Sequence, residues 1–163
     1  MSAIILLLVF SMLAVIWLDG TRYIIPNWLV GLLLISYPAA LSMSHHSVDW
    51  KLSIAGALMV LVVGYVIFTK RIMGGGDIKL LTVCSLWVGL DHLADFLTIV
   101  ALIGGVFAVL VWCIRKGLPY LPKKPAKETL PRILRDGEPL PYGVAIAIGF
   151  LWMMWTGAVI FIL

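Results

Sequence analysis

Long apolar stretches alternate with short polar segments along this chain. A transmembrane helix needs about 20 apolar residues, and about 17 suffice in the shortest cases. Stretches of roughly that length occupy residues 2–18, 27–44, 52–69, 74–90, 96–114 and 143–163. The pattern predicts an all-α polytopic membrane protein with about six transmembrane helices, forming a single domain over residues 1–163.

The fourth stretch is the weakest of the six. Only the segment from Leu80 to Leu90 is firmly apolar, and Asp91 follows it. The stretch reaches the length of a span only if its helix begins inside the glycine run at residues 74–76, next to Asp77. We therefore predict a helix that starts within the glycines.

The composition fits a membrane protein. Of the 163 residues, 63% are hydrophobic and only 12% are charged, which leaves too little polar surface for a soluble domain of this size. We expect a multi-pass protein of the cell (inner) membrane, without a nucleic-acid partner. Cys84 and Cys113 form no C-x-x-C pair and the histidines show no ligand spacing, so neither a metal nor another cofactor is expected.

The basic residues predict an orientation. Eleven of the 12 Lys and Arg residues follow the first, third or fifth stretch, and only Lys51 falls on the other side. Cytoplasmic loops carry the excess of Lys and Arg, so the chain is predicted to start and end outside. No Lys or Arg precedes Arg22, which favours a retained first span over a signal peptide.

The segment at residues 115–142 is the only long polar one. It holds six of the eight prolines, which argues against a long helix. Seven basic residues oppose three acidic ones there. The segment is predicted either to lie as a flexible loop on anionic lipid headgroups or to reorder when a substrate arrives.

Two aspartates stand apart from the other acidic residues. Asp19 ends the first stretch, together with Gly20, and Asp77 begins the fourth. The second and third stretches form one out-and-back hairpin, so both aspartates are predicted at the same face and at similar depth. An ionised aspartate inside a membrane costs about 2.5–3.5 kcal/mol and is a functional suspect by default. The alternative is an ordinary helix-edge role, as a turn former for Asp19 and an N-cap for Asp77.

Two carboxylates held close together share a proton. The ionised one can deprotonate a water molecule while the protonated one polarises a carbonyl group. This is the chemistry of an aspartyl protease, and it needs neither metal nor cofactor. Glycines beside Asp77 would give a substrate backbone room to approach.

These residues resemble the type IV prepilin peptidase family of GxGD intramembrane aspartyl proteases. The run Gly74-Gly75-Gly76-Asp77 fits the GxGD motif, and Lys79 extends it to GxGDxK. Asp19 is followed by Ile25-Pro26-Asn27, which is the usual context of the first catalytic aspartate in that family. Pro141-Tyr142-Gly143 opens the last stretch, as a similar segment does in many members.

The resemblance implies an endopeptidase that removes the cytoplasmic leader of Flp-type prepilins or pseudopilins after a glycine, with Asp19 and Asp77 as catalytic residues. The chain looks like the short CpaA/TadV-type form, so N-methylation of the product is not expected. Substrate binding or shaping of the site is expected of Gly74, Gly75, Gly76, Lys79, Asn27, Pro141, Tyr142 and Gly143. The partners implied are the prepilin and membrane lipids, and the oligomeric state stays open.

Several alternatives remain at this point. Archaeal preflagellin peptidases share the aspartate motifs, and presenilin-like proteases share GxGD but carry the first aspartate after a tyrosine. A small proton-coupled transporter would also keep paired acids in a wet cavity, and a structural assembly subunit would not need Asp77.

Two neighbouring polar residues allow two interpretations each. Lys79 either favours an ionised carboxylate nearby or snorkels to the membrane interface. Asn27 either donates a hydrogen bond near Asp19 or caps the second helix, and we favour the cap.

Overall fold

The computed structural model describes residues 2–43, 49–117, 132–135, 138 and 140–159, and these are helical apart from short connections. The predicted all-α fold is confirmed, since this part of the chain contains no strand. The elements are α1 (Ser2–Arg22), α2 (Asn27–Met43), α3 (Trp50–Thr69), α4 (Gly75–Val88), α5 (Leu93–Gly117), the 3-10 turn η2 (Arg132–Leu134) and α6 (Tyr142–Trp155).

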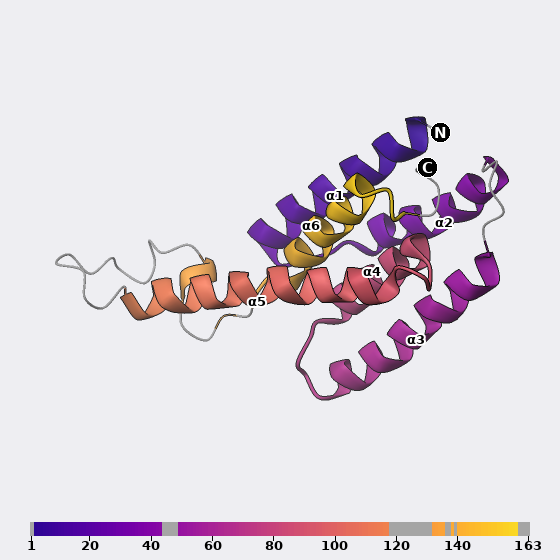
Figure 1. The fold of residues 1–163 in the computed structure, drawn as a ribbon. Coiled ribbons are helices and arrows are strands. Elements are labelled where there is room, and N and C mark those ends of the chain that lie inside the picture. Colours follow the sequence, from indigo (N-terminus) through magenta and orange to yellow (C-terminus); the bar gives the residue numbers. More distant parts are fainter. Residues whose placement is uncertain (1, 44–48, 118–131, 136–137, 139, 160–163) are drawn as a thin grey trace.

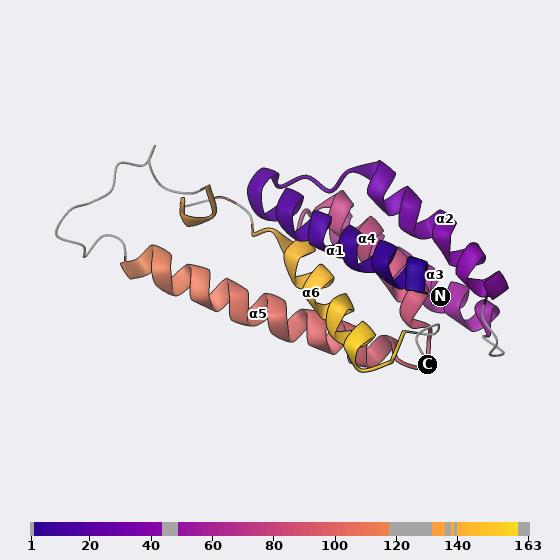
Figure 2. The ribbon, with the colours of Figure 1, turned by 90° about the horizontal axis from the view of Figure 1, so that it is seen from above.

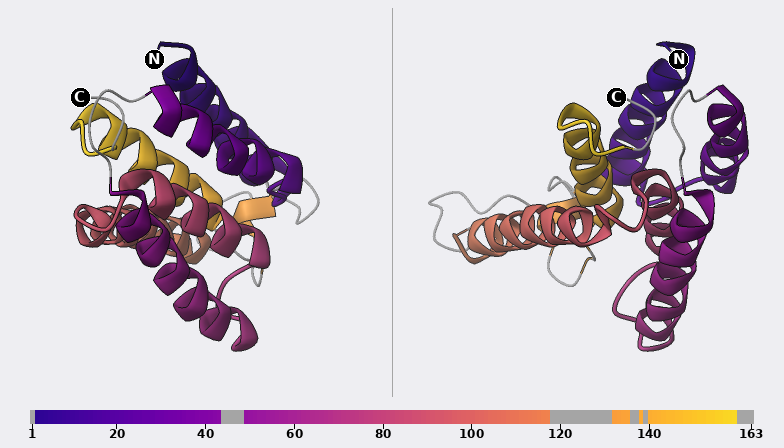
Figure 3. Two further views of the ribbon diagram at one scale, coloured as in Figure 1. Left: turned by 90° about the vertical axis from the view of Figure 1, so that its right-hand side faces the viewer. Right: turned by 45° about the vertical axis from the view of Figure 1, so that its right-hand side comes forward.

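Helices α4 and α6 lie at the centre of the bundle. Helix α4 packs against α2, α3, α5 and α6, whereas α6 packs against α1, α4 and α5. Figure 2 shows α5 as a long helix along one side, and Figure 1 shows α3 at the periphery beside α4. The two views in Figure 3 show α2 beside α1 on the opposite side from α5. The two shortest α-helices are therefore more buried than any other helix that the structure describes.

Helix lengths divide the bundle into two classes. Three helices are long and apolar enough to cross a membrane, namely Ala3–Arg22 within α1, Trp50–Thr69 and Leu93–Gly117. Helices α2 and α6 are apolar but shorter. Helix α4 has 14 residues, which at about 1.5 Å per residue gives roughly 21 Å, less than the hydrocarbon core of about 30 Å. Neighbouring helices rather than lipid therefore surround α4.

Close backbone approaches hold the central helices. A Cβ on Gly64 would lie 2.6 Å from Ile78 Cγ2, and one on Gly149 would lie 2.7 Å from Val100 Cγ2. Trp87 is fully buried in α4, and its Nε1 donates to the carbonyl oxygen of Leu33 in α2 at 3.0 Å. These contacts fix α4 against α3 and α2, and α6 against α5.

The predicted end of the first helix is wrong. Helix α1 does not stop at Asp19-Gly20 but continues to Arg22, so that Asp19 lies in its last turn. The N–H of Tyr23 donates to the carbonyl oxygen of Asp19 at 3.0 Å, which continues the backbone hydrogen-bonding pattern of the helix past Gly20. The helix ends where Tyr23 adopts a positive φ of 57°.

The sixth helix is shorter than predicted. It begins at Tyr142 and ends at Trp155, whereas the sequence suggested a span over residues 143–163, of which the last four lie outside the described residues. Gly157 has φ 75°, its N–H donates to Met154, and the N–H of Ala158 donates to Met153. This is a Schellman motif, which terminates a helix whatever the hydropathy beyond it.

The predicted start of the fourth helix is confirmed. Gly74 is the N-cap of α4 and Asp77 lies in the first turn, so the helix begins within the glycine run. Asp77 is not the N-cap, contrary to the alternative considered above. Helix α3 begins at Trp50 because Asp49 accepts hydrogen bonds from the N–H groups of Lys51 and Leu52 at 3.2 Å each.

Candidate active site

A cavity opens at the end of the bundle where α1 ends and α4 and α6 begin. In Figure 1 the C-terminal end of α1 lies beside the start of α6. The cavity measures about 290 Å³ and is lined by Asp19, Tyr23, Ile25, Ile72, Met73, Gly74, Gly76, Asp77, Leu140, Pro141 and Tyr142. The predicted proximity of the two aspartates is confirmed, because both line this one cavity.

Asp19 is the more deeply buried of the two, at 4% exposure. A Cβ on Gly143 would lie only 2.7 Å from Asp19 Oδ2, so the carboxylate rests directly against the backbone at the start of α6. The amides of Gly143 and Val144 lie near enough to interact electrostatically with this carboxylate. Asp19 Oδ2 nevertheless forms no hydrogen bond within the described part of the chain. Its remaining acceptor capacity is available to a ligand.

Asp77 stands across the cavity in the first turn of α4. It lies within Coulombic range of Asp19 and interacts with the backbone amides of Gly74 and Gly143. The N-terminus of a helix favours a negative charge, and the neighbouring Asp19 opposes one. The Gly143 amide is thus shared between the two aspartates.

The glycines of the motif have different surroundings. Gly74 and Gly76 line the cavity, whereas Gly75 does not, and a Cβ there would face the ring of Phe68 in α3 at 3.4 Å. A Cβ on Gly76 would lie 3.4 Å from Ile25, and one on Gly143 would lie 2.7 Å from the same side chain. Ile25 is therefore wedged between α4 and α6. The expectation that the glycines give room to a substrate stays a prediction, and Gly75 is the one of the three that does not line the cavity.

A profile of the type IV leader peptidase family matches residues 6–109. The chain belongs to this family. The match contains both cavity aspartates, and it ends before the Pro141-Tyr142-Gly143 segment, which only the structure brings to them. Comparisons with curated proteins and with solved structures give no match. The chain is therefore a peptidase of a family that uses aspartate chemistry.

A hydrogen bond outside the cavity joins the two aspartate motifs. Lys79 Nζ donates to Asn27 Oδ1 at 3.1 Å. Asn27 is the first residue of α2, and the carbonyl of Pro26 accepts from the N–H groups of Leu29 and Val30. The favoured interpretation of Asn27 as the cap is thus wrong, because its side-chain oxygen is directed to Lys79. Lys79 is exposed and does not line the cavity.

Sequence reasoning missed Tyr23, which lines the cavity. It lies four residues after Asp19, a spacing that places two side chains on one helix face and could have indicated it. Its hydroxyl oxygen is buried and forms no hydrogen bond within the described residues. Burial above all, with a further contribution from the carboxylate of Glu138, raises the pKa of this hydroxyl above its ordinary value, so it stays protonated at neutral pH.

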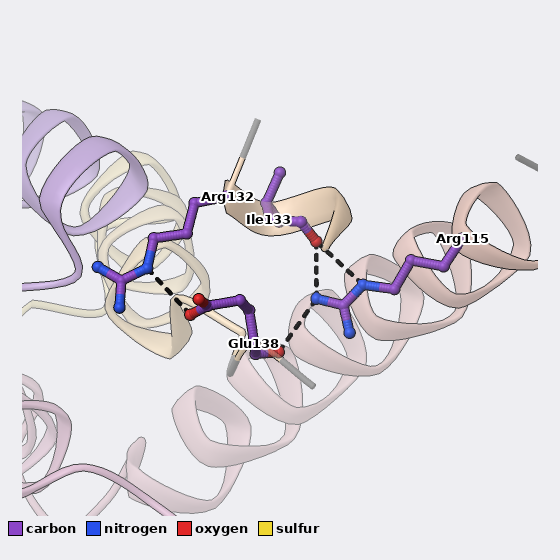
Figure 4. Close-up of polar contacts among 4 residues, drawn as sticks. All are labelled: Arg115, Arg132, Ile133 and Glu138. Atoms are coloured by element: carbon purple, nitrogen blue, oxygen red, sulfur yellow. Dashed lines mark hydrogen bonds and ion pairs between the residues drawn. The ribbon is translucent and has the colours of Figure 1, made fainter. Parts of the chain in front are cut away.

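A network of arginines covers the outer side of Tyr23. The guanidinium carbon of Arg132 lies 4.9 Å from the centre of the Tyr23 ring, and its Nε is 2.9 Å from Glu138 Oε2. Figure 4 shows this ion pair beside Arg115 of α5, which donates to backbone carbonyls of Ile133 and Glu138. The described part of segment 115–142 therefore packs against the candidate active site. The predicted lipid contacts of this segment are not tested, and its lysines at 123, 124 and 127 lie outside the described residues.

Proposed function

We propose that this leader peptidase hydrolyses a peptide bond of a prepilin or pseudopilin with Asp19 and Asp77 as its catalytic pair. The observation that carries the proposal is that both carboxylates line one cavity of about 290 Å³ at the same end of the bundle. Their mutual Coulombic interaction supports a shared proton, with one carboxyl group protonated and the other ionised.

The reaction follows from those two protonation states. The ionised carboxylate takes a proton from water, and the water oxygen adds to the scissile carbonyl carbon. The protonated carboxyl group donates to the carbonyl oxygen and stabilises the tetrahedral intermediate. The C–N bond then breaks as its nitrogen takes a proton from the pair. The products are the leader with a new carboxyl group and the mature subunit with a new amino group.

The cavity is placed on the cytoplasmic side in this proposal. The described cations near it include Arg22, Arg71 and Arg115, at the ends of α1, α3 and α5, whereas Lys51 lies at the start of α3, at the far end of the bundle. Positive residues mark the cytoplasmic side of membrane proteins. The substrate leader would therefore be removed at the cytoplasmic membrane boundary, after a glycine and from Flp-type prepilins or pseudopilins.

Co-expression with a Flp-type prepilin tests the proposal. The wild-type chain should shorten the prepilin by its leader, and Asp19→Asn and Asp77→Asn should each abolish this, because an amide cannot take the proton from water. Asp95→Asn is the matched control, since Asp95 is exposed in the first turn of α5 at the other end of the bundle. Leader removal at the wild-type rate by either site variant would refute the catalytic pair. A structural subunit or a transporter would instead remove no leader even as the wild-type chain.

A further inference from the structure

Arg115 directs its side chain to the protein's own backbone. Its Nε and Nη2 donate to the carbonyl oxygen of Ile133 at 3.0 and 2.7 Å, and Nη2 also donates to that of Glu138 at 3.0 Å. The planar guanidinium suits such multiple contacts, which a lysine cannot reproduce. The side chain is part-buried, unlike that of its neighbour Lys116, which is exposed and lies 6.0 Å from the Trp112 ring. Arg115 is therefore not a simple headgroup contact.

The carbonyl groups that accept hydrogen bonds from Arg115 belong to residues that precede α6 in the chain. Leu140, Pro141 and Tyr142 follow Glu138 closely in sequence and line the cavity of the two aspartates. Gly143 comes next and lies against the Asp19 carboxylate. Pro141 has a restricted φ, so little freedom separates a fixed Glu138 from the start of α6. Anchoring Glu138 thus limits where this side of the cavity can lie.

A second contact joins the same segment to the loop after Asp19. Arg132 pairs with the Glu138 carboxylate at 2.9 Å and covers the ring of Tyr23 at 4.9 Å. The N–H of Tyr23 donates to the carbonyl oxygen of Asp19 at 3.0 Å. Figure 4 shows Arg115 and Arg132 approaching Glu138 from opposite sides. Through Glu138, α5 is connected to the end of α1 that carries Asp19.

We infer that Arg115 is a positioning residue of the candidate active site, which holds the start of α6 against Asp19 through the backbone of Ile133 and Glu138. The inference deepens the proposed function and rests on it for its catalytic readout. Arg115 does not touch the cavity aspartates. Its loss should let the segment from Leu140 to Gly143 move, and thereby weaken the alignment of Asp19 with the scissile bond.

The test compares Arg115→Gln and Arg115→Lys with Lys116→Gln, a matched loss of charge at the next position. Purified proteins are assayed on a prepilin for kcat and KM, and backbone amides are followed by hydrogen–deuterium exchange. Arg115→Gln should lower kcat on the order of tenfold, since a small misplacement of reacting groups is costly, and should change KM less. Amides of residues 140–144 should exchange faster. The kcat and the amide exchange of Arg115→Lys should be close to those of Arg115→Gln. Those of Lys116→Gln should be close to the wild-type values.

Three outcomes would overturn the inference. The first is an unchanged kcat with unchanged exchange at residues 140–144. The second is a lower kcat with faster exchange throughout the bundle, which would make Arg115 a general stability residue. The third is activity that depends on phosphatidylglycerol in the vesicles and loses this dependence in Arg115→Gln, which would make Arg115 a lipid contact. Cleavage by Asp19→Asn would instead refute the proposed function. The exchange of residues 140–144 in the Arg115 variants would still show whether Arg115 holds this segment in place.

Discussion

Gly143 and Asp19 are in direct contact across the α1–α6 interface. A Cβ at position 143 would lie 2.7 Å from Asp19 Oδ2 and 3.0 Å from Asp19 Cγ. Because Asp19 is buried at 4% exposure, it has little room to move away. The missing side chain at Gly143 is thus a condition for the observed position of the carboxylate.

Gly143→Ala should consequently damage the site. The added methyl group overlaps both Asp19 and the Cδ1 atom of Ile25, which also lies at 2.7 Å. Overpacking of this kind costs about 1–3 kcal/mol of unfolding free energy, and displacement of a catalytic group by about 1 Å can reduce the rate about 100-fold. Thermal unfolding and prepilin cleavage measure the two effects.

The control for that prediction is Gly31→Ala in α2, where an added Cβ meets nothing within 4 Å. It should leave cleavage unchanged and raise stability by about 0.5–1 kcal/mol, the usual effect of replacing a mid-helix glycine. If Gly143→Ala cleaves as well as Gly31→Ala, the contact with Asp19 does not matter for catalysis.

Tyr23→Phe should be neutral or stabilising. The hydroxyl oxygen is buried and forms no hydrogen bond within the described residues, and an unsatisfied buried polar atom costs about 1–3 kcal/mol. Removing it leaves the ring beneath Arg132 in place. We expect the unfolding free energy to rise by about 1 kcal/mol and cleavage to be retained. A large loss of cleavage in Tyr23→Phe would show that the hydroxyl has a ligand during the reaction.

Tyr23→Leu is the informative contrast. It also removes the hydroxyl, but it removes the ring that Arg132 covers at 4.9 Å as well. Loss of that cation–π contact should cost about 0.5–1 kcal/mol relative to Tyr23→Phe. In an Arg132→Gln background the difference between the two variants should shrink by that amount, because only the cation–π contribution depends on Arg132.

The hydrogen bond between Lys79 and Asn27 should stabilise the fold without affecting the protonation of the aspartates. Lys79→Met and Asn27→Ala should each lower the unfolding free energy by about 0.5–1 kcal/mol, the usual range for an exposed charged contact, because the pair joins α2 to α4 at 3.1 Å. The double variant should lose less than the two single losses together. A pH–rate profile that shifts in Lys79→Met would contradict this assignment, because it would couple Lys79 to the aspartates.

The sequence was sufficient where one physical requirement dominated. The start of α4 within the glycines followed from the minimum length of a membrane-spanning helix. The proximity of Asp19 and Asp77 followed from the two membrane crossings between them, which return the chain to the same face. It was insufficient where a helix end or a contact depends on tertiary packing. Asp19 was predicted to end the first helix, which ends just before Tyr23 instead. The residues after Trp155 are apolar, so the sequence pattern gave no sign of the turn at Gly157.

The polar contacts around the site were beyond sequence reasoning for a related reason. Lys79 and Asn27 are far apart in the chain, and no pattern pairs their side chains before α2 and α4 are packed. Arg115 was grouped with the other cations of a basic loop, where charge alone suggested lipid. Its geometry, with donors directed to Ile133 and Glu138, distinguishes it from them.

The glycine motif should show unequal sensitivity to substitution. Gly74→Ala adds a Cβ 3.0 Å from Asp77 Oδ2, inside the cavity, whereas Gly75→Ala adds one 3.4 Å from the Phe68 ring, outside it. Gly74 has φ −69°, so alanine is not strained there, and its effect combines the contact with Asp77 and the weaker N-cap that alanine provides. We expect Gly74→Ala to lower kcat/KM about tenfold, a loss of roughly 1.4 kcal/mol in transition-state stabilisation, and Gly75→Ala to stay within about twofold of wild type. Equal losses in the two variants would mean that backbone freedom of the whole run, rather than room beside Asp77, is what the motif preserves.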